Sequence, residues 1–504
     1  MSSHAVGNYA SSSTAMRFGA AIALPGWYLF ALFSPFSVSG SYAGMALVLV
    51  GTTLVLPQFW RDIRHEPVFW LSAALVAYLF VRSLLAFMEF PQLIDAKNPG
   101  WTDLLQAMPL LAIPMGWWLY LRPRHIRYVL ATGLAGIFVG IFYAGDWSQL
   151  LNWRMADANT WRVAAGYHPN FLGLMSAVAL FVVGSWLMLQ TDSSRTHLRW
   201  LVGLPLLAVL AILFYSSQSR AAWLGFLPAL IALIGWVLWQ VRGEVSLQRG
   251  LGVVLAIVGF LAVTVGVWMW VDGGTIGLNR ITSESSTAWL MLSGDFHAAA
   301  TEADATGWRI GTWLSGLEAA SSRPWFGWGP GAIEVIPDAG YADRTLAHFH
   351  NLYLEIFVGF GLVGLALSAI CAWLLVRAAV AASRHQLWSP AMAGGLLAVS
   401  ILTAVALFFM IRIGQSEGRA LLRIIEAFFV LAVFRVAAFR KTSDASTWLP
   451  KSDRLRGYVL KARNRNASTP LRSPLQKPAG PGHSCKQRHD PDENRLPRWP
   501  ARDR

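Results

Sequence analysis

Charged residues are scarce in this chain. Only 13% of its 504 residues are charged, whereas 55% are hydrophobic, and a soluble protein carries roughly twice that charged fraction. Cysteine is scarcer still, with Cys371 in an apolar run and Cys485 in a polar C-terminal segment. A disulfide bond would have to join these two very different environments, so we expect none. The low charge argues against a soluble globular protein.

Motifs for nucleotide chemistry are also missing. The sequence has no Walker loop, no dinucleotide-binding glycine fingerprint after a strand and no Cys-x-x-Cys pair. ATP-driven transport and nicotinamide chemistry therefore have no support, and we expect no cofactor. The net charge of +14 does not indicate a nucleic-acid partner, because residues 440–504 carry most of the excess, with 16 Lys/Arg against 6 Asp/Glu.

Long apolar runs dominate the sequence instead. A helix needs about 20 apolar residues to cross a bilayer, and the chain has twelve such runs, which predict an all-α polytopic membrane protein of about 12 transmembrane helices. The runs are 17–36, 42–60, 68–88, 103–121, 127–145, 171–190, 198–216, 221–241, 250–271, 351–377, 390–412 and 419–439. The first run has no clear cleavage site, so we interpret it as a retained span rather than a signal peptide.

Arginines in alternate short connections predict the orientation. These connections each hold two or three arginines and should be cytoplasmic; they begin near Arg61, Arg122, Arg195, Arg242 and Arg377. An even number of spans then places both termini inside. The predicted division is a cytoplasmic N-terminus (1–16), nine spans (17–271), a large, partly helical periplasmic loop (272–350), three spans (351–439) and a basic tail (440–504). The tail should be disordered and suits anionic lipid.

Several arginines fall on the outward side, against this rule. Arg220 lies in a short polar break between two apolar runs, so its guanidinium is held at the membrane surface, where a charge needs a partner. The partner is either a lipid phosphate or carboxylate, or a bound phosphorylated lipid that accepts two parallel hydrogen bonds. Arg162 precedes the sixth span, and Arg412 and Arg419 flank the last outward turn with few acids nearby. Together these cations predict an anion-binding site.

A histidine marks the point where the large loop re-enters the membrane. Because an imidazole titrates near neutral pH, His350 could accept a proton from a hydroxyl group; the alternative is a purely structural histidine. Asn351, next to it, suits a helix cap. A metal site is a competing interpretation, with ligands drawn from His348, His350, Asp295, Glu302 and Asp304, but the His-x-His spacing puts both rings on one side only in an extended segment.

Three motifs, taken together, resemble the bacterial O-antigen ligases, which are grouped with O-antigen polymerases and protein O-oligosaccharyltransferases. The motifs are a short arginine loop (Ser219–Trp223), an arginine motif with a following glycine turn (Arg309–Trp313 and Arg323–Gly331), and a histidine motif (His350–Gly361). One position departs from the family pattern, because Trp313 stands where ligases typically have leucine. The resemblance covers most of residues 17–440 and excludes the tail.

The resemblance implies a GT-C-like glycosyltransferase in the bacterial inner membrane. It would transfer O-antigen polysaccharide from undecaprenyl pyrophosphate to a sugar hydroxyl of lipid A–core at the periplasmic face. His350 would be the general base, and Arg220 and Arg309, with Arg162, would stabilise the pyrophosphate. Similar enzymes invert the anomeric carbon without a metal. The remaining substrate-binding residues predicted are His168, His348, Asn351, Arg412 and Arg419.

Three alternatives stay open. An O-antigen polymerase shares the donor chemistry, although the complete histidine motif and the single large late loop favour the ligase. A protein O-oligosaccharyltransferase differs only in its acceptor. A membrane transporter, from another class, predicts polar residues at mid-membrane and internal repeats, and neither is clear in this sequence.

Overall fold

The computed structural model describes residues 14–91, 109–144, 169–188, 196–240, 285–302, 304–336, 349–385, 387–388, 390–409 and 416–447, with isolated positions between 252 and 266. Every regular element in these ranges is a helix, and no strand occurs among the described residues. The all-α class predicted from the apolar runs is therefore confirmed.

The helices follow the apolar runs closely. In chain order they are α2 (Thr14–Phe33), α3 (Val38–Thr53), α4 (Leu56–Ile63), α5 (Pro67–Glu89), α7 (Pro109–Leu121), η2 (Pro123–His125), α8 (Ile126–Ala144), α10 (Pro169–Met188), α11 (Thr196–Ser216), α12 (Arg220–Gln240), α15 (Ser285–Leu292), α16 (Phe296–Thr301), α17 (Ala305–Ser322), η4 (Ala332–Glu334), α18 (Leu352–Arg384), α19 (Pro390–Phe409) and α20 (Ser416–Thr447).

The described helices are those of a multi-pass membrane protein. Six are long and apolar enough to span a bilayer, and the bent pair α3–α4 makes up to seven. Three shorter apolar helices, α7, α12 and α19, and the long helix α20 coincide with four further predicted spans. The predicted span at 250–271 lies outside the described residues apart from isolated positions. The total of twelve spans stays a prediction.

The second predicted span, 42–60, is broken. Helix α3 ends at Thr53 and α4 begins at Leu56, and their axes differ by 90°. Pro57 lies in the first turn of α4; in a continuous helix its ring would clash with the carbonyl of Thr53, four residues earlier. Proline at this position favours a new helix start, which hydropathy alone does not reveal.

Glycines allow α2 and α3 to pack closely. A Cβ atom added to Gly26 would lie 2.7 Å from the carbonyl oxygen of Gly44, and one added to Gly51 would lie 2.6 Å from that of Gly19. Small residues at such contacts let helix backbones approach each other where lipid provides no hydrophobic driving force.

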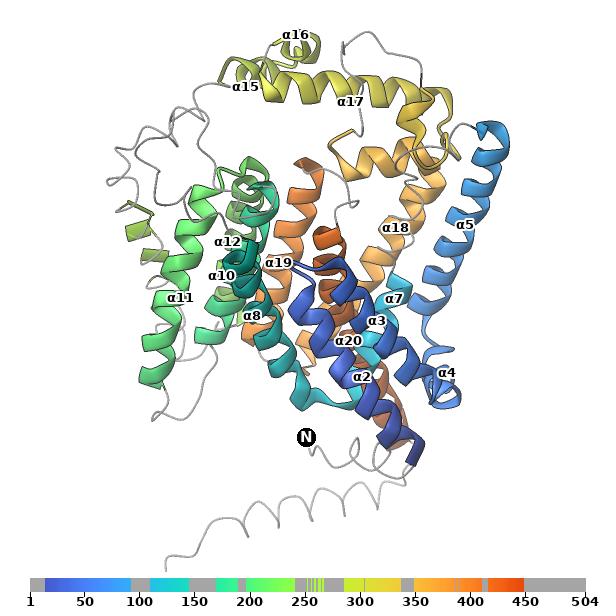
Figure 1. Ribbon diagram of the computed structural model, residues 1–504, viewed down its shortest axis with the longest axis vertical. Helices are drawn as coiled ribbons and strands as arrows, with labels where there is room; N and C mark the ends of the chain where they lie inside the picture. Colours follow the sequence, from blue (N-terminus) through green and yellow to red (C-terminus); the bar gives the residue numbers. More distant parts are fainter. Residues whose placement is uncertain are drawn as a thin grey trace, which may run out of the picture. The chain divides into compact units, whose positions relative to one another are not determined.

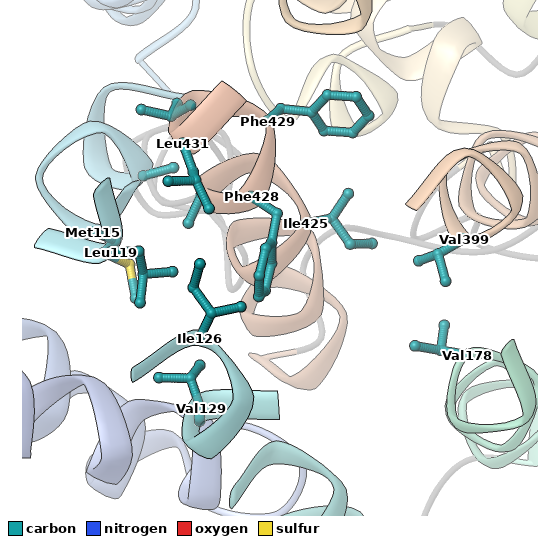
Figure 2. Packing of buried hydrophobic residues seen from close by; sticks show 14 of the residues in the cluster. Met115, Leu119, Ile126, Val129, Val178, Val399, Ile425, Phe428, Phe429 and Leu431 are labelled. Carbon is teal, nitrogen blue, oxygen red and sulfur yellow. The ribbon is translucent and has the colours of Figure 1, made fainter. Parts of the chain in front are cut away.

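The C-terminal helix α20 contributes much of the largest apolar core. Figure 2 shows Ile425, Phe428 and Leu431 of α20 among side chains of α7 and α8, while Val399 of α19 faces Val178 of α10. Helix α20 continues to Thr447, past the predicted end of the last span at 439, because no proline or glycine follows until Pro450. The rest of the predicted tail lies outside the described residues.

Helix α18 differs from its predicted span in length and in shape. It ends at Arg384 instead of 377, and Gly361 interrupts it with φ 63° and ψ −169°. A short helix, Leu352–Phe360, therefore precedes the long one. In Figure 1, helix α17 (yellow) lies across the ends of the long helices, beside the start of α18. The partly helical character predicted for residues 272–350 is confirmed by α17.

Candidate active site

The polar break before Arg220 is buried inside the protein. Ser216, Ser217, Gln218 and Ser219 are at most 1% exposed, and Gln218 has a left-handed backbone with φ 51°. The Ser219 hydroxyl accepts a 3.3 Å hydrogen bond from the amide of Ala222 and so caps helix α12. Left-handed backbone at a non-glycine residue is costly and concentrates at functional sites. The fold thus fixes the backbone from which the Arg220 side chain extends.

The Arg220 side chain reaches the beginning of α17. Its Nη1 donates a 3.3 Å hydrogen bond to Oγ1 of Thr306. The first turn of α17 is itself held by Asp304, whose Oδ1 accepts from the amides of Thr306 and Gly307 at 2.9 and 2.6 Å. A second carboxylate oxygen of Asp304 accepts a hydrogen bond from Thr287 of α15. The contact therefore joins a membrane helix to a well-capped helix of the large loop.

His350 lies against the next residues of the same helix. Its imidazole and the indole of Trp308 are 4.8 Å apart between ring centroids, at an interplanar angle of 75°, an edge-to-face arrangement favoured by aromatic pairs. His350 also has a left-handed backbone, with φ 55°. The first turn of α17 thus contacts Arg220 through Thr306 and His350 through Trp308, although Arg220 and His350 are 130 positions apart in sequence.

Hydrogen bonds on both sides of His350 hold this segment in place. The Trp313 indole donates to the carbonyl of Phe349 at 2.9 Å, and the Phe349 amide donates to Oε1 of Glu355 at 3.1 Å. Asn351 Oδ1 accepts from the Leu354 amide at 3.2 Å, which is the helix cap expected of it. The aromatic residue at 313, where ligases typically have leucine, thus helps to position the segment that carries His350.

Arg309 is the third predicted catalytic residue. It is half-buried and follows Thr306 by three positions on α17, so the two share a helix face. The cations Arg220 and Arg309 thus belong to one neighbourhood around the first turns of α17. The carboxylate there, Asp304, accepts hydrogen bonds from backbone amides and Thr287. The two arginines suit an anionic ligand, and His350 contacts the same turn of α17 through Trp308.

The other predicted substrate-binding residues are not placed. Arg162, His168, His348 and Arg412 lie outside the described residues, and Arg419 lies in α20 with its side chain outside the described part. Their contribution to the site stays a prediction.

Two of the three carboxylates of the alternative metal site cap helices. Asp304 caps α17, and Oδ1 of Asp295 accepts from the Ala298 amide at 3.0 Å and so caps α16. Among the described residues, no three side chains of His, Cys, Asp or Glu are close enough together to hold a metal ion.

The predicted glycine turn, Arg323–Gly331, pairs with the break in α18. The amides of Trp328 and Gly329 donate to the carbonyls of Val358 and Gly359, both at 2.8 Å. On the other side of the break, the amides of Leu362 and Val363 donate to the turn at 2.8 and 3.2 Å. The last residue of the histidine motif, Gly361, is therefore the point where the loop joins the helix that begins beside His350.

Alanine at Gly361 should disrupt this junction. A Cβ atom there would lie 2.3 Å from the carbonyl carbon of Trp325, and the residue has φ 63°. Left-handed backbone and a buried clash together should cost at least about 2 kcal/mol. We expect Gly361→Ala to lower the unfolding temperature of the purified protein in detergent. Gly235→Ala is the control, because nothing lies within 4 Å of a Cβ atom at Gly235; equal unfolding temperatures would contradict the assigned role.

Some site residues could not be found from sequence. Thr306 and Trp308 have no unusual charge or spacing, and only their contacts to Arg220 and His350 reveal them. Arg309, one position further, was visible because an arginine on the outward side breaks a topological rule.

Fold and site together define a multi-pass helical membrane protein with a cationic, histidine-bearing site beside its largest loop. Residues 205–369 match the family model described as O-antigen ligase. The matched region contains all three motifs, from the arginine loop at Ser219 to Gly361, and the match supports a member of the O-antigen ligase family. It indicates a function of the O-antigen ligase or polymerase type, with a membrane glycosyltransferase-like activity. Comparison of the chain with curated proteins gives no significant match.

Proposed function

We propose that this protein transfers O-antigen polysaccharide from undecaprenyl pyrophosphate to a sugar hydroxyl of lipid A–core, completing lipopolysaccharide at the periplasmic face of the inner membrane. The observation that carries the proposal is the pair of contacts made by α17, from Thr306 to Arg220 and from Trp308 to His350. An arginine suited to pyrophosphate and a histidine suited to proton transfer thus both contact the first turn of α17. The O-antigen ligase match supports the same reaction class.

The course of α5 supports a periplasmic site. This helix begins at Pro67, next to the arginine-rich connection that includes Arg64, and ends at Glu89, which forms a 2.5 Å ion pair with Arg323 at the end of α17. Its 23 residues rise about 35 Å, which is enough to cross a bilayer. The arginine-rich connection belongs in the cytoplasm, so we place the large loop, at the other end of α5, in the periplasm. With the predicted even number of spans, both termini would then be cytoplasmic.

The proposed reaction is a single displacement at the anomeric carbon. The acceptor hydroxyl oxygen bonds to that carbon as the bond to the pyrophosphate oxygen breaks, which inverts the configuration. His350 takes the hydroxyl proton, and the electron pair of the broken bond leaves with undecaprenyl pyrophosphate. Arg220 and Arg309 stabilise the charge on that leaving group. Arg162, Arg412 and Arg419, with His168 and His348, are proposed to contact donor or acceptor.

We further propose that the arginines perform the electrostatic role that a divalent metal has in many glycosyltransferases. Arginine offers planar, paired donors to phosphate and stays charged at all relevant pH values. Transfer by the purified protein should then persist in excess EDTA.

The test that separates the ligase from its relatives uses a strain lacking this gene. We expect lipid A–core without attached polysaccharide, and accumulation of long lipid-linked chains, when lipopolysaccharide is separated by gel electrophoresis. Lipid A–core that retains one attached repeat would indicate a polymerase instead. Intact lipopolysaccharide together with loss of protein glycosylation would indicate an oligosaccharyltransferase. Normal lipopolysaccharide and normal protein glycosylation would contradict the proposal and favour a membrane transporter.

A further inference from the structure

An arginine within the α5 span contacts the glycine turn. Arg82 is 7% exposed, its Nε donates to the carbonyl of Phe326 at 2.8 Å, and its Nη2 donates to that of Gly327 at 2.6 Å. Charged residues within transmembrane helices are costly and are retained for a role with a named partner. Here the partners are two backbone carbonyls of the loop.

The break in α18 explains why such a partner is needed. Interrupting a helix at Gly361 leaves carbonyls before it, and amides after it, without their helical partners. Non-helical backbone at membrane depth persists only where protein satisfies those groups. The carbonyls of Val358 and Gly359 accept from the turn, and the carbonyl of Phe360 accepts from the Tyr78 hydroxyl of α5 at 2.6 Å. The amides of Leu362 and Val363 donate back to the turn.

The hydrogen bonds with α18 use two amides and two carbonyls of the turn. Arg82 binds two further carbonyls, which lie between those groups in the sequence. The carbonyls of Pro324 and Trp325 accept from α18, while those of Phe326 and Gly327 accept from Arg82. The turn also lies close against α5, because a Cβ atom on Gly329 would lie 2.1 Å from that of Ala86. Helix α5, the turn and the two halves of α18 are thus held as one polar junction.

The junction lies at one end of the short helix Leu352–Phe360, and His350 precedes the other end. The nine residues of that helix extend about 14 Å. A rotation of about 10° at the break would therefore shift His350 by roughly 2 Å. Misplacement of a catalytic group by about 1 Å can reduce a rate by about 100-fold. The stiffness of the junction consequently bears on the position of the base.

We propose that Arg82 is a positioning residue. It ties the Arg323–Gly331 turn to α5, holds the turn against the break in α18, and thereby sets the direction of the helix that His350 precedes. This inference rests on the proposed function for its link to catalysis. Arg82 is not assigned to pyrophosphate, because its Nε and Nη2 donate to carbonyls and the residue is 7% exposed.

The junction can be tested without any substrate by hydrogen–deuterium exchange of the full-length protein in nanodiscs. In Arg82→Met we expect peptides covering 324–331 and 358–364 to exchange at least tenfold faster, with peptides of α10 and α12 unchanged. Arg82→Lys, which lacks the planar pair of donors, should show most of this effect. Leu84→Ala, at an exposed position on the same helix, is the control and should match the wild type. Unchanged exchange in both peptides, or faster exchange everywhere, would overturn the proposal.

A milder variant covers the case in which Arg82→Met does not insert. Tyr78→Phe removes only the hydroxyl that donates to Phe360, so exchange should rise in 358–364 and stay unchanged in 324–331. If neither peptide responds, α5 does not support the junction.

Transfer kinetics distinguish positioning from substrate binding. For Arg82→Lys we expect kcat to fall 10- to 100-fold, with KM for the lipid-linked donor within about twofold of the wild-type value. A raised KM with normal kcat would mean that Arg82 binds the donor. Unchanged kinetics despite faster exchange would mean that the junction does not affect transfer. Either result overturns the proposal. If the wild-type protein shows no transfer at all, the proposed function fails while the exchange experiment still decides the junction.

Discussion

Replacing His350 by asparagine should abolish glycan transfer while the protein still inserts and folds. Asparagine tolerates the left-handed backbone that His350 adopts, with φ 55°, and it forms hydrogen bonds, but it cannot accept a proton at neutral pH. General-base catalysis contributes about 10²- to 10⁴-fold. We therefore expect the transfer rate, measured with purified protein and lipid-linked donor, to fall by at least about 100-fold.

The control for this experiment is another histidine of the same loop. His297 is exposed on α16, and His297→Ala should retain the wild-type rate. His350→Ala should be as inactive as His350→Asn, because both remove the proton acceptor. Full activity in either His350 variant would show that the imidazole is structural, packed against Trp308 and without a role in proton transfer.

Arg220→Ala should have the second largest effect, because it removes a cation from the proposed pyrophosphate site. The loss of one preorganised donor to a developing negative charge typically lowers kcat by about 10²- to 10³-fold. Arg220→Lys should recover part of the rate, since it restores the charge without the planar pair of donors. The measurement is kcat for transfer at saturating donor, with membrane insertion checked in parallel.

Two further variants locate the cause of that effect. Thr306→Val removes the hydroxyl that accepts from Arg220 and should lower the rate by less than Arg220→Ala does, because the cation stays. Arg384→Ala removes an exposed arginine from the last turn of α18 and should leave the rate unchanged. If Arg220→Ala keeps the wild-type kcat, Arg220 serves only to join α12 to the large loop.

Hydropathy was sufficient for the membrane helices because one long apolar run produces one helix. Helices α5, α10 and α11 coincide with their predicted spans to within a few residues. Hydropathy does not reveal a break where a proline or a glycine interrupts the helix within an apolar run. Pro57 divides the run at 42–60 into two helices bent by 90°, and Gly361 divides α18. Neither residue lowers the average hydropathy of its run enough to divide it, so only the backbone chemistry of proline and glycine signals the breaks.

The candidate site was only partly visible in the sequence. Arg220 and Arg309 were recognisable because arginine is disfavoured on the outward side, and His350 because of its place at a membrane re-entry. Trp308 and Thr306 were not, since an aromatic residue and a threonine in a loop have many ordinary roles. Arg82 gives no signal of its role within its apolar run, because its partners, the carbonyls of Phe326 and Gly327, lie more than 240 positions away.

The sequence by itself determined that this is a helical membrane protein, and it determined which types of residue are available for chemistry. These properties depend on composition and on the order of apolar runs. Only the tertiary structure decided which residues meet. Contacts such as Arg220 with Thr306, His350 with Trp308, and Arg82 with the glycine turn depend on how helices pack and where backbone groups lack helical partners. Those are properties of the folded chain, since each contact joins segments that no local pattern relates.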